Sequence, residues 1–484
     1  MNIVDDAKKI YGKEIPGISG FYNIINSWAN IFKNNTFWSR VKKGGLYGGE
    51  RMMNKLGTAK VLSDEFSHLT FSEQVSISVN EKYNDYVQDV LRKNGFWKRM
   101  PSFLSFCYAM GGGVLKVYAE DGKPCINYVN AELFVPMSWT EKEITEGVFE
   151  SKIYKNGFYY TFFEKYFVNP NKNIAVECKL FKSSRSTSIG KECPVSELYP
   201  DMLDNFEYQT SEPMFRYFAP ENSNNVDWYV PLGASVFSNA IDTLKALDVA
   251  FDSFEREFSL GKKRIIVPSS CIRTVVDTET GEPKRYFDAD DEAFVALKSE
   301  DSNDLKIVDN TVELRIEEHV MAINALLNIL CFQTGLSAGA LSFDAAQGLK
   351  TATEVISADS KTARTTNANK NLVVELIEGL VRSIIALGIA LGDIPASKDD
   401  DYGITVQMPD TVIIDDNTKM QNIINLVTAG LMSKLAAIME LKGCDEATAK
   451  KELAQIAKEQ NITGDISDGI ILTDDENINT EGAE

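Results

Sequence analysis

One long segment of the chain has no residue that breaks a helix. From Gly348 to Leu372 it reads GLKTATEVISADSKTARTTNANKNL, with no proline and no glycine after the first residue. The residues that follow, VVELIEGLVRSIIALGIALGDI, are strongly apolar. The absence of breakers predicts one long helix. However, positions 357–371 contain no large apolar side chain, so this polar half has no hydrophobic face to bury.

Three arrangements of the polar half are compatible with the sequence. Disorder is disfavoured, because the segment runs without a break into the apolar half. An exposed helix held by ion pairs is disfavoured, because four charged residues between positions 359 and 370 are too few. We therefore expect small residues to pack against identical neighbouring copies, which implies a ring around a water-filled passage. These small residues are Ala358, Ala363, Thr366 and Ala368.

The composition is that of a globular protein with a sizeable core. The 484 residues suit two to four packed units, and 44% of them are hydrophobic. Neither the first residues, MNIVDDAKKIYG, nor any apolar run resembles a signal peptide or a membrane span. Seven scattered cysteines without a CxxC pair predict neither a disulfide framework nor a zinc site. We expect a soluble protein of a reducing compartment, with no membrane partner.

The first half of the chain predicts helices beside an antiparallel sheet. Helices are expected near residues 51–68 and 84–110. Asp121-Gly122 and Asn156-Gly157 each separate two runs of strand-forming residues, which is a strong short-range signal of a β-hairpin. This part of the chain therefore indicates an α+β fold.

Two long helices are expected around a small β-rich insert. Apolar residues three or four positions apart extend from Ser235 to Gly261, and again from about Val312 to Thr334. Asp252 is expected on the polar side of the first helix. The residues between the two helices contain short β-forming runs and a TETGEP turn.

The last part of the chain predicts a strand, further helices and an acidic tail. The strand is expected at YGITVQMPD, and the helices near 417–441 and 445–459. The tail from Gly464 has seven acids and no base, so we expect it to be disordered.

Signals of enzymatic chemistry are weak. Neither of the two histidines, His68 and His319, stands in an HExxH pattern. The glycines at 111–113 follow a helix and precede a strand, which is the reverse of the order in phosphate-binding loops. Acids cluster at 288–292, 400–401 and 415–416. We expect no enzyme, no cofactor and no metal site, and a metal-dependent nuclease using clustered acids is the alternative.

One run of three basic residues follows the first long helix. The residues are Lys262, Lys263 and Arg264. A helix dipole favours cations at the C-terminal end of the helix, so a structural role is sufficient to explain them. A contact with DNA or with an acidic partner is the alternative.

Two stretches resemble the portal proteins of tailed bacteriophages, in particular the type common in phages of Gram-positive hosts. They are PLGASVFSNAIDTLKALDVAFDSFEREFSLGKKRIIVP (231–268) and QGLKTATEV (347–355). YAMGGGVLKVY and NAELFVP fit the same family. The resemblance extends in consistent order from about residue 20 to residue 460. It rests on this long ordered match, because no single motif in it is a catalytic signature.

The resemblance implies a portal fold with an α/β wing, a two-helix stem, a small β-containing clip, a long spanning helix and an α-helical crown. Carried onto this sequence, the parts are the wing at 1–233, stem helices at 234–261 and 311–335, the clip at 262–310, the tunnel loop at 336–350, the long wing helix at 351–398, the crown at 399–463 and the acidic tail at 464–484.

The resemblance also implies partners and a location. Copies of the chain would form a ring, usually of twelve subunits, at one capsid vertex of the virion, after assembly in the cytoplasm of the bacterial host. Double-stranded DNA would pass through the ring. Other partners would be the terminase large subunit, head–tail adaptor proteins, and major capsid and scaffold proteins. Residues expected at or near the DNA channel are Ser342, Asp344, Gln347, Lys350 and Lys361.

The charge of the chain fits such a conduit. Twelve helices of about 10 Å diameter, side by side, leave a bore of about 28 Å, wide enough for duplex DNA. DNA carries one negative charge per about 1.7 Å of axis, so a basic lining would hold it. The formal net charge of −20 predicts instead a wall along which DNA slides. A non-portal structural or adaptor protein of a phage-like particle is a further alternative.

Overall fold

The computed structural model divides the chain into two compact units, Met1–Thr411 and Val412–Glu484. The structure describes residues 3–42, 49–71, 75–261, 265–266, 273–276, 283–286, 308–309, 313–343, 352–396, 402–408, 416–442 and 449–456. Buried apolar residues of the first unit form one continuous core that includes both helices and sheets.

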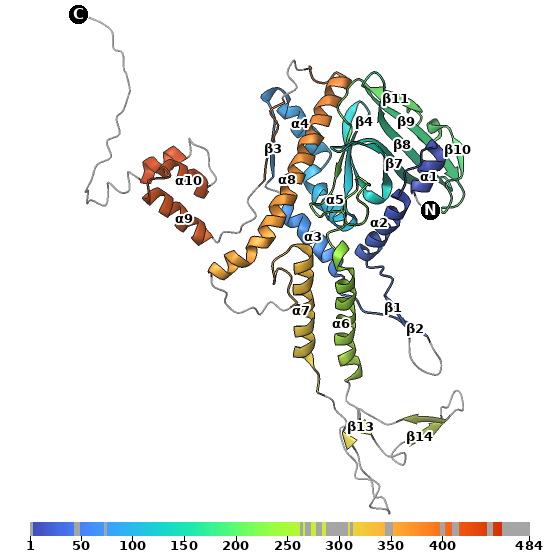
Figure 1. The fold of residues 1–484 in the computed structure, drawn as a ribbon, viewed down its shortest axis with the longest axis vertical. Helices are drawn as coiled ribbons and strands as arrows, with labels where there is room; N and C mark the ends of the chain where they lie inside the picture. The colour runs from blue at the N-terminus through green and yellow to red at the C-terminus, as the bar shows by residue number, and fades with distance from the viewer. Residues whose placement is uncertain are drawn as a thin grey trace, which may run out of the picture. The chain divides into compact units, whose positions relative to one another are not determined.

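Two antiparallel sheets with more than two strands lie in the described part of the first unit (Figure 1). The larger has the order β10-β9-β8-β7-β6, with β11 paired to β9. Its strands are β6 (Phe134–Trp139), β7 (Ile144–Lys155), β8 (Phe158–Val168), β9 (Ile174–Ser183), β10 (Lys191–Cys193) and β11 (Asn205–Tyr208). The smaller has the order β12-β4-β5, formed by β4 (Gly113–Glu120), β5 (Lys123–Asn130) and β12 (Phe215–Phe218).

Both hairpins predicted from the sequence are confirmed. β4 pairs with β5 across Asp121-Gly122, and β7 pairs with β8 across Asn156-Gly157. The φ angles of the four turn residues are 51°, 70°, 52° and 83° in chain order. Two successive residues with positive φ are what a two-residue type I′ turn requires, and this turn matches the twist of the paired strands. The mixed α+β class is therefore confirmed.

Two helices predicted before β4 differ in the structure. The described helices before β4 are α1 (Ile3–Tyr11), α2 (Ile18–Phe32), α3 (Thr58–Thr70), α4 (Glu81–Lys93) and α5 (Phe96–Met110). The helix expected at 51–68 begins at Thr58, because the preceding residues form β2 (Glu50–Met52), which pairs with β1 (Arg40–Lys42). The helix expected at 84–110 is two helices, because Gly95 adopts a left-handed φ of 62° between them.

The glycines after α5 form a tight turn from helix to strand. Gly111 has a φ of 78°, and a Cβ there would lie 2.4 Å from the carbonyl oxygen of Gly233. This close approach of two backbones requires glycine, and it explains the residue type without a bound phosphate.

Two long helices, α6 (Ile241–Leu260) and α7 (Ile316–Thr334), run side by side (Figure 1). α6 begins later than expected, because Ser238–Ala240 forms a 3₁₀ turn before it. Between the helices, β13 (Ile265–Ile266) pairs with β16 (Val308–Asp309), and β14 (Arg273–Val276) pairs with β15 (Pro283–Tyr286). The expected β-containing insert is therefore confirmed within the described residues.

The segment without breakers forms one helix of 40 residues, α8 (Ala352–Leu391), as the sequence predicts. Its apolar half is buried in the first unit, where α8 packs on β12, β4 and α3. The fully buried residues of this half include Val373, Ile377, Leu380, Ile384 and Leu387. After α8, β17 (Thr405–Gln407) pairs with β3 (Ser76–Ser78), so the expected strand belongs to the first unit.

The second unit is helical in its described part. It contains α9 (Asp416–Thr428), α10 (Lys434–Lys442) and a helical stretch at 449–456. The single helix expected at 417–441 is wrong, because a turn containing Gly430, with φ of 69°, separates α9 from α10.

Candidate functional site

The polar half of α8 has polar partners inside its own chain. The Ser337 amide donates to Thr362 Oγ1 at 2.8 Å, and Thr365 Oγ1 donates to the Gly335 carbonyl at 2.8 Å. The Glu221 amide donates to Asn369 Oδ1 at 3.1 Å. This half is therefore stabilised by hydrogen bonds to loop backbone, which need no hydrophobic stripe.

This packing corrects one expectation. Thr366, expected to contact a neighbouring copy, is only 2% exposed within its own chain. Ala363 and Ala368 are half-buried, and the side chain of Ala358 lies outside the described residues. The contacts with the loop that follows α7 are made by two other small residues of this half, Thr362 and Thr365.

That loop runs back along α7. α7 ends at Gly335, which has a φ of 83°. Beyond it, the Gly339 amide donates to Asn328 Oδ1 at 2.9 Å, and the Phe343 amide donates to Asn324 Oδ1 at 2.8 Å. Ser342 therefore lies beside the middle of α7, whereas Asp344, Gln347 and Lys350 lie outside the described residues.

Lys361 lies at the C-terminal end of α7. Its Nζ donates to the Phe332 carbonyl at 2.9 Å and lies 4.7 Å from the centre of the Phe332 ring. A cation is favoured there by the α7 dipole and by the face of the ring. Lys361 thus joins α8 to the C-terminal end of α7, whereas Ser342 lies beside the middle of α7.

Polar contacts at both ends hold α6 against α7. At one end, Thr243 Oγ1 donates to Gln333 Oε1 at 2.8 Å. At the other end, the Arg315 guanidinium donates to both oxygens of Glu257, at 3.1 and 3.0 Å. These hydrogen bonds lower the pKa of Glu257 from its usual 4.5 to about 2. Lys262, Lys263 and Arg264, which follow α6, lie outside the described residues.

The other side of α6 holds the segment around β1 and β2. Trp38 Nε1 donates to Asp248 Oδ2 at 2.8 Å, and the Arg51 guanidinium donates to both oxygens of Asp252, at 2.7 and 2.5 Å. The hydrogen bonds from Arg51 lower the pKa of Asp252, whereas burial raises the pKa of Asp248. Asp252 is 5% exposed, so its expected position on a solvated polar side is wrong.

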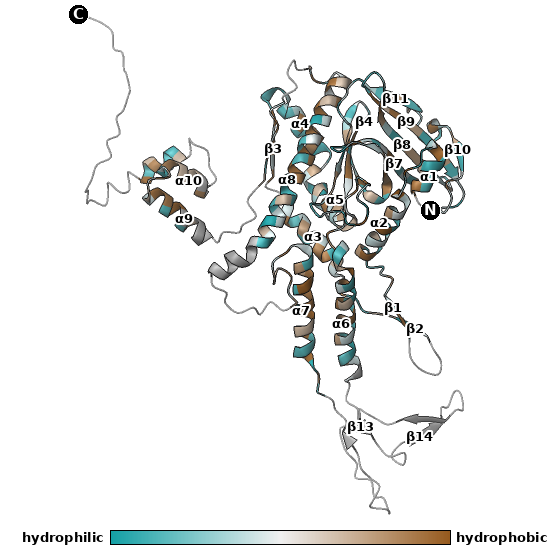
Figure 2. Cartoon of the chain, in the orientation of Figure 1, coloured by the Kyte–Doolittle hydropathy of each residue, from teal (hydrophilic) through white to brown (hydrophobic). Residues whose placement is uncertain are grey.

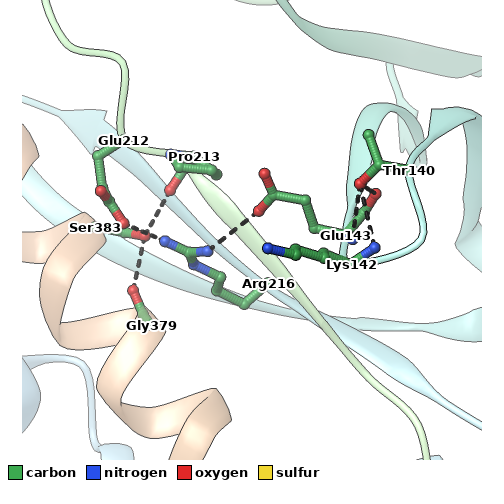
Figure 3. Close-up of polar contacts among 8 residues, drawn as sticks. All are labelled: Thr140, Lys142, Glu143, Glu212, Pro213, Arg216, Gly379 and Ser383. Carbon is green, nitrogen blue, oxygen red and sulfur yellow. Dashed lines mark hydrogen bonds and ion pairs between the residues drawn. The ribbon is translucent and has the colours of Figure 1, made fainter.

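A third contact fixes α8 to the smaller sheet (Figure 3). Arg216 of β12 lies against Gly379 of α8, where a Cβ would come within 2.9 Å of the Arg216 Cδ and Nε atoms. The Arg216 guanidinium pairs with Glu212 and lies 3.8 Å from Glu143. Nearby, the Ser383 hydroxyl donates to the Pro213 carbonyl at 2.6 Å. These contacts set the position of α8, and none of them forms a site for a substrate.

Two kinds of reactive group among the described residues bear on catalysis, clustered metal ligands and cysteine thiols. Among them, no three His, Cys, Asp or Glu side chains gather as a metal site requires. The acids at 288–292 and 400–401 lie outside the described residues. Burial raises the pKa of the Cys107 thiol, and it raises that of Cys178 to about 12, so these two cysteines are poor nucleophiles. Every helix in the described part of the chain is too short or too polar to span a bilayer.

Sequence reasoning found the helices of this site but missed the side chains that join them. Trp38, Arg51 and Arg315 are separated from their partners by 210, 201 and 58 residues. No local pattern marks such pairs. The one available signal was the amphipathic pattern of α6, which predicted Asp252 on its polar side.

Comparisons with protein families and with solved structures show which proteins this chain resembles. A sequence model of the family described as "Phage portal protein, SPP1 Gp6-like" matches residues 8–463. Among solved structures, a chain of the "Virion of native gene transfer agent (GTA) particle" is similar, with 10% identity over 80% of this chain and 88% of that chain. Its TM-score of 0.37 is too low to support an argument about fold or function. No curated protein matches this chain.

Proposed function

Because this chain belongs to the phage portal protein family, of the SPP1 Gp6-like type, we propose that it forms the ring-shaped conduit through which double-stranded DNA enters and leaves a capsid. The observation that carries the proposal is the family match over residues 8–463. Proteins of this family are structural components of a virion that assemble with copies of themselves. The ring would stand at one capsid vertex, after assembly in the host cytoplasm.

The parts of the portal are assigned as the resemblance implies. α6 and α7 would be the stem, the β-containing insert between them the clip, and the first unit up to residue 233 the wing. α8 would be the long wing helix, and the helices from 416 onward would belong to the crown. The clip would bind the terminase large subunit and later the head–tail adaptors, and major capsid or scaffold proteins would contact the outside of the ring. ATP hydrolysis would come from the terminase, with no catalysis by this chain.

The exposed side of α6 is compatible with a wall along which DNA slides. Its exposed residues include Asp242, Lys245, Val249 and Ser253. One acid and one base stand there beside uncharged residues, so the surface would not bind phosphates through a continuous basic stripe. Ser342 would belong to the tunnel loop, beside the middle of α7, and Lys361 would stand near it at the C-terminal end of α7.

Imaging of the purified protein tests the proposal. We expect closed rings with a central hole by negative-stain microscopy, together with a mass that is a multiple of the 53.9 kDa chain. Monomers or open filaments would contradict it. Rings without a hole wide enough for duplex DNA would favour a non-portal structural protein, and cleavage of DNA that depends on a divalent ion would favour the nuclease.

A further inference from the structure

The solvent-facing side of α7 carries an exposed apolar stripe. We define the α7 stripe as Met321, Ala325, Ile329 and Phe332. The three large residues of the stripe are 63%, 47% and 77% exposed in chain order. Spacings of three or four place them on one side of the helix, as in a seam between packed helices. Figure 2 shows that hydrophobic residues extend over much of α7.

A second exposed apolar patch lies on the segment that carries β1 and β2. We define the arm patch as Phe37, Arg40 and Met52, of which Phe37 is 75% and Met52 61% exposed. The three residues border a hollow of about 510 Å³ whose other wall is formed by polar residues of α2. Phe37 is held in place, because the edge of its ring packs against Trp38 at 4.8 Å between centroids.

The two patches lie on opposite sides of α6. Asp248 and Asp252 of α6 bind the arm side, whereas Thr243 and Glu257 bind α7. With 3.6 residues per turn, these two pairs of positions point in nearly opposite directions from the helix axis. Figure 1 shows the same arrangement, with α7 on one side of α6 and β1 and β2 on the other.

The charges beside the two patches are complementary. Glu317 and Glu318 in the first turn of α7 are exposed. Arg40 of the arm patch and the neighbouring Lys42 of β1 are exposed, and Arg40 lies 3.7 Å from Glu50 of its own chain. With Phe332 on the arm patch, Glu317 and Glu318 would lie about 20 Å away along α7. Their attraction to Arg40 and Lys42 would therefore act at long range and orient the approach of the two copies, without forming ion pairs at the contact.

We propose that the α7 stripe of one copy packs on the arm patch of the next copy in the ring. The inference rests on the proposed function only in that copies of the chain assemble. Because the two patches differ and lie on opposite flanks, the contact is heterologous, and a heterologous contact that closes generates a ring. Phe332 of one copy would meet the aromatic ring of Phe37, the sulfur of Met52 and the guanidinium of Arg40, each of which attracts an aromatic ring.

A cysteine cross-link tests the contact directly. The double variant Phe332→Cys with Met52→Cys is oxidised under mild conditions and run on a denaturing gel without reductant. We expect a ladder of covalent oligomers that each single variant and the wild-type chain, with its seven native cysteines, do not give. Rings by microscopy without a ladder would overturn the docking and leave the conduit standing. Wild-type monomers would overturn the proposed function itself.

A mixing experiment tests whether the contact is heterologous. Phe332→Asp places a charge in the α7 stripe and leaves the arm patch intact. Met52→Asp places a charge in the arm patch and leaves the α7 stripe intact. We expect each variant alone to be monomeric. An equimolar mixture restores one good contact per pair, and we expect dimers without rings. Leu203→Asp, at a residue 67% exposed outside both patches, is the control and should still form rings. Circular dichroism checks that each variant is folded, and rings from either folded variant, or no dimers in the mixture, would refute the proposal.

Discussion

Arg315, the residue before α7, donates to both carboxylate oxygens of Glu257 in the last turn of α6, at 3.1 and 3.0 Å. This ion pair brings together the two ends of the insert at 262–312, because Glu257 lies just before the insert and Arg315 just after it. His319 Nε2 lies 3.7 Å from the same carboxylate, and the His319 ring packs on Phe254 at 5.9 Å. The α6–α7 pair is therefore held at this end by one acid.

The Glu257 carboxylate makes the stability of the α6–α7 pair depend on pH. The pKa of Glu257 is lowered from 4.5 to about 2 in the folded chain. The stabilisation that the charged Glu257 carboxylate gives to the folded chain is thus fully present above pH 4.5 and is lost as the pH falls toward 2. We expect hydrogen exchange of amides at the end of α6 to accelerate through this window. Glu257→Gln should remove most of that pH dependence, and an unchanged profile in this variant would show that another group is responsible.

The approach of Arg216 to Gly379 predicts opposite effects of the same substitution at two helical glycines. Gly379→Ala would place a Cβ 2.9 Å from the Arg216 side chain, which must then shift. We expect a net loss of about 1–2 kcal/mol in the free energy of unfolding, because overpacking outweighs the gain in helix propensity. Gly20→Ala in α2 meets nothing within 4 Å and should stabilise by about 0.5–1 kcal/mol. Chemical denaturation measures both, and equal effects would contradict the close packing.

Features that are set by residues adjacent in the sequence could be predicted. The turns at Asp121-Gly122 and Asn156-Gly157 were predictable because residues that tolerate positive φ are rare in strands. The long helix α8 was predictable from the absence of breakers alone. Gly95 was missed as a break, because a single glycine inside a helical pattern is usually tolerated.

The side-chain contacts of the site could not be predicted. Asp252 is polar and lies in an amphipathic helix, and its burial is made possible by its half-buried partner Arg51, about 200 residues away. For the polar half of α8, the sequence led us to expect contacts with a neighbouring copy, whereas the structure shows polar partners in its own chain. Composition showed that it lacks an apolar face, but the loop backbone that accepts and donates its hydrogen bonds, at Gly335 and Ser337, is set by the tertiary fold.

The hydrogen bonds of Thr362 predict that a small apolar substitution in the polar half of α8 is costly. Thr362 Oγ1 accepts from the Ser337 amide at 2.8 Å and lies 3.0 Å from the Ser337 hydroxyl. Thr362→Val keeps the shape and leaves the Ser337 amide without this acceptor, so we expect a loss of about 1–3 kcal/mol. Asn367→Ala, at an exposed position of the same helix, should change stability by less than about 0.5 kcal/mol. Similar values for the two variants in denaturant titrations would mean that the loop contact contributes little.

The exposed side of α6 gives a prediction about transport. If this side lines the conduit, added cations would bind phosphates and hold the DNA, because each neutralised phosphate releases counterions. Val249→Lys with Ser253→Lys should therefore slow DNA packaging, with the largest effect at low salt. The matched control is Ser184→Lys with Ser186→Lys, which adds the same charge to an exposed loop after β9 and should leave the packaging rate unchanged. The rate of DNA packaging is measured in an assembled system. Equal rates for the two variants would show that this side of α6 does not face the DNA. Slowing that disappears at high salt would establish an electrostatic contact.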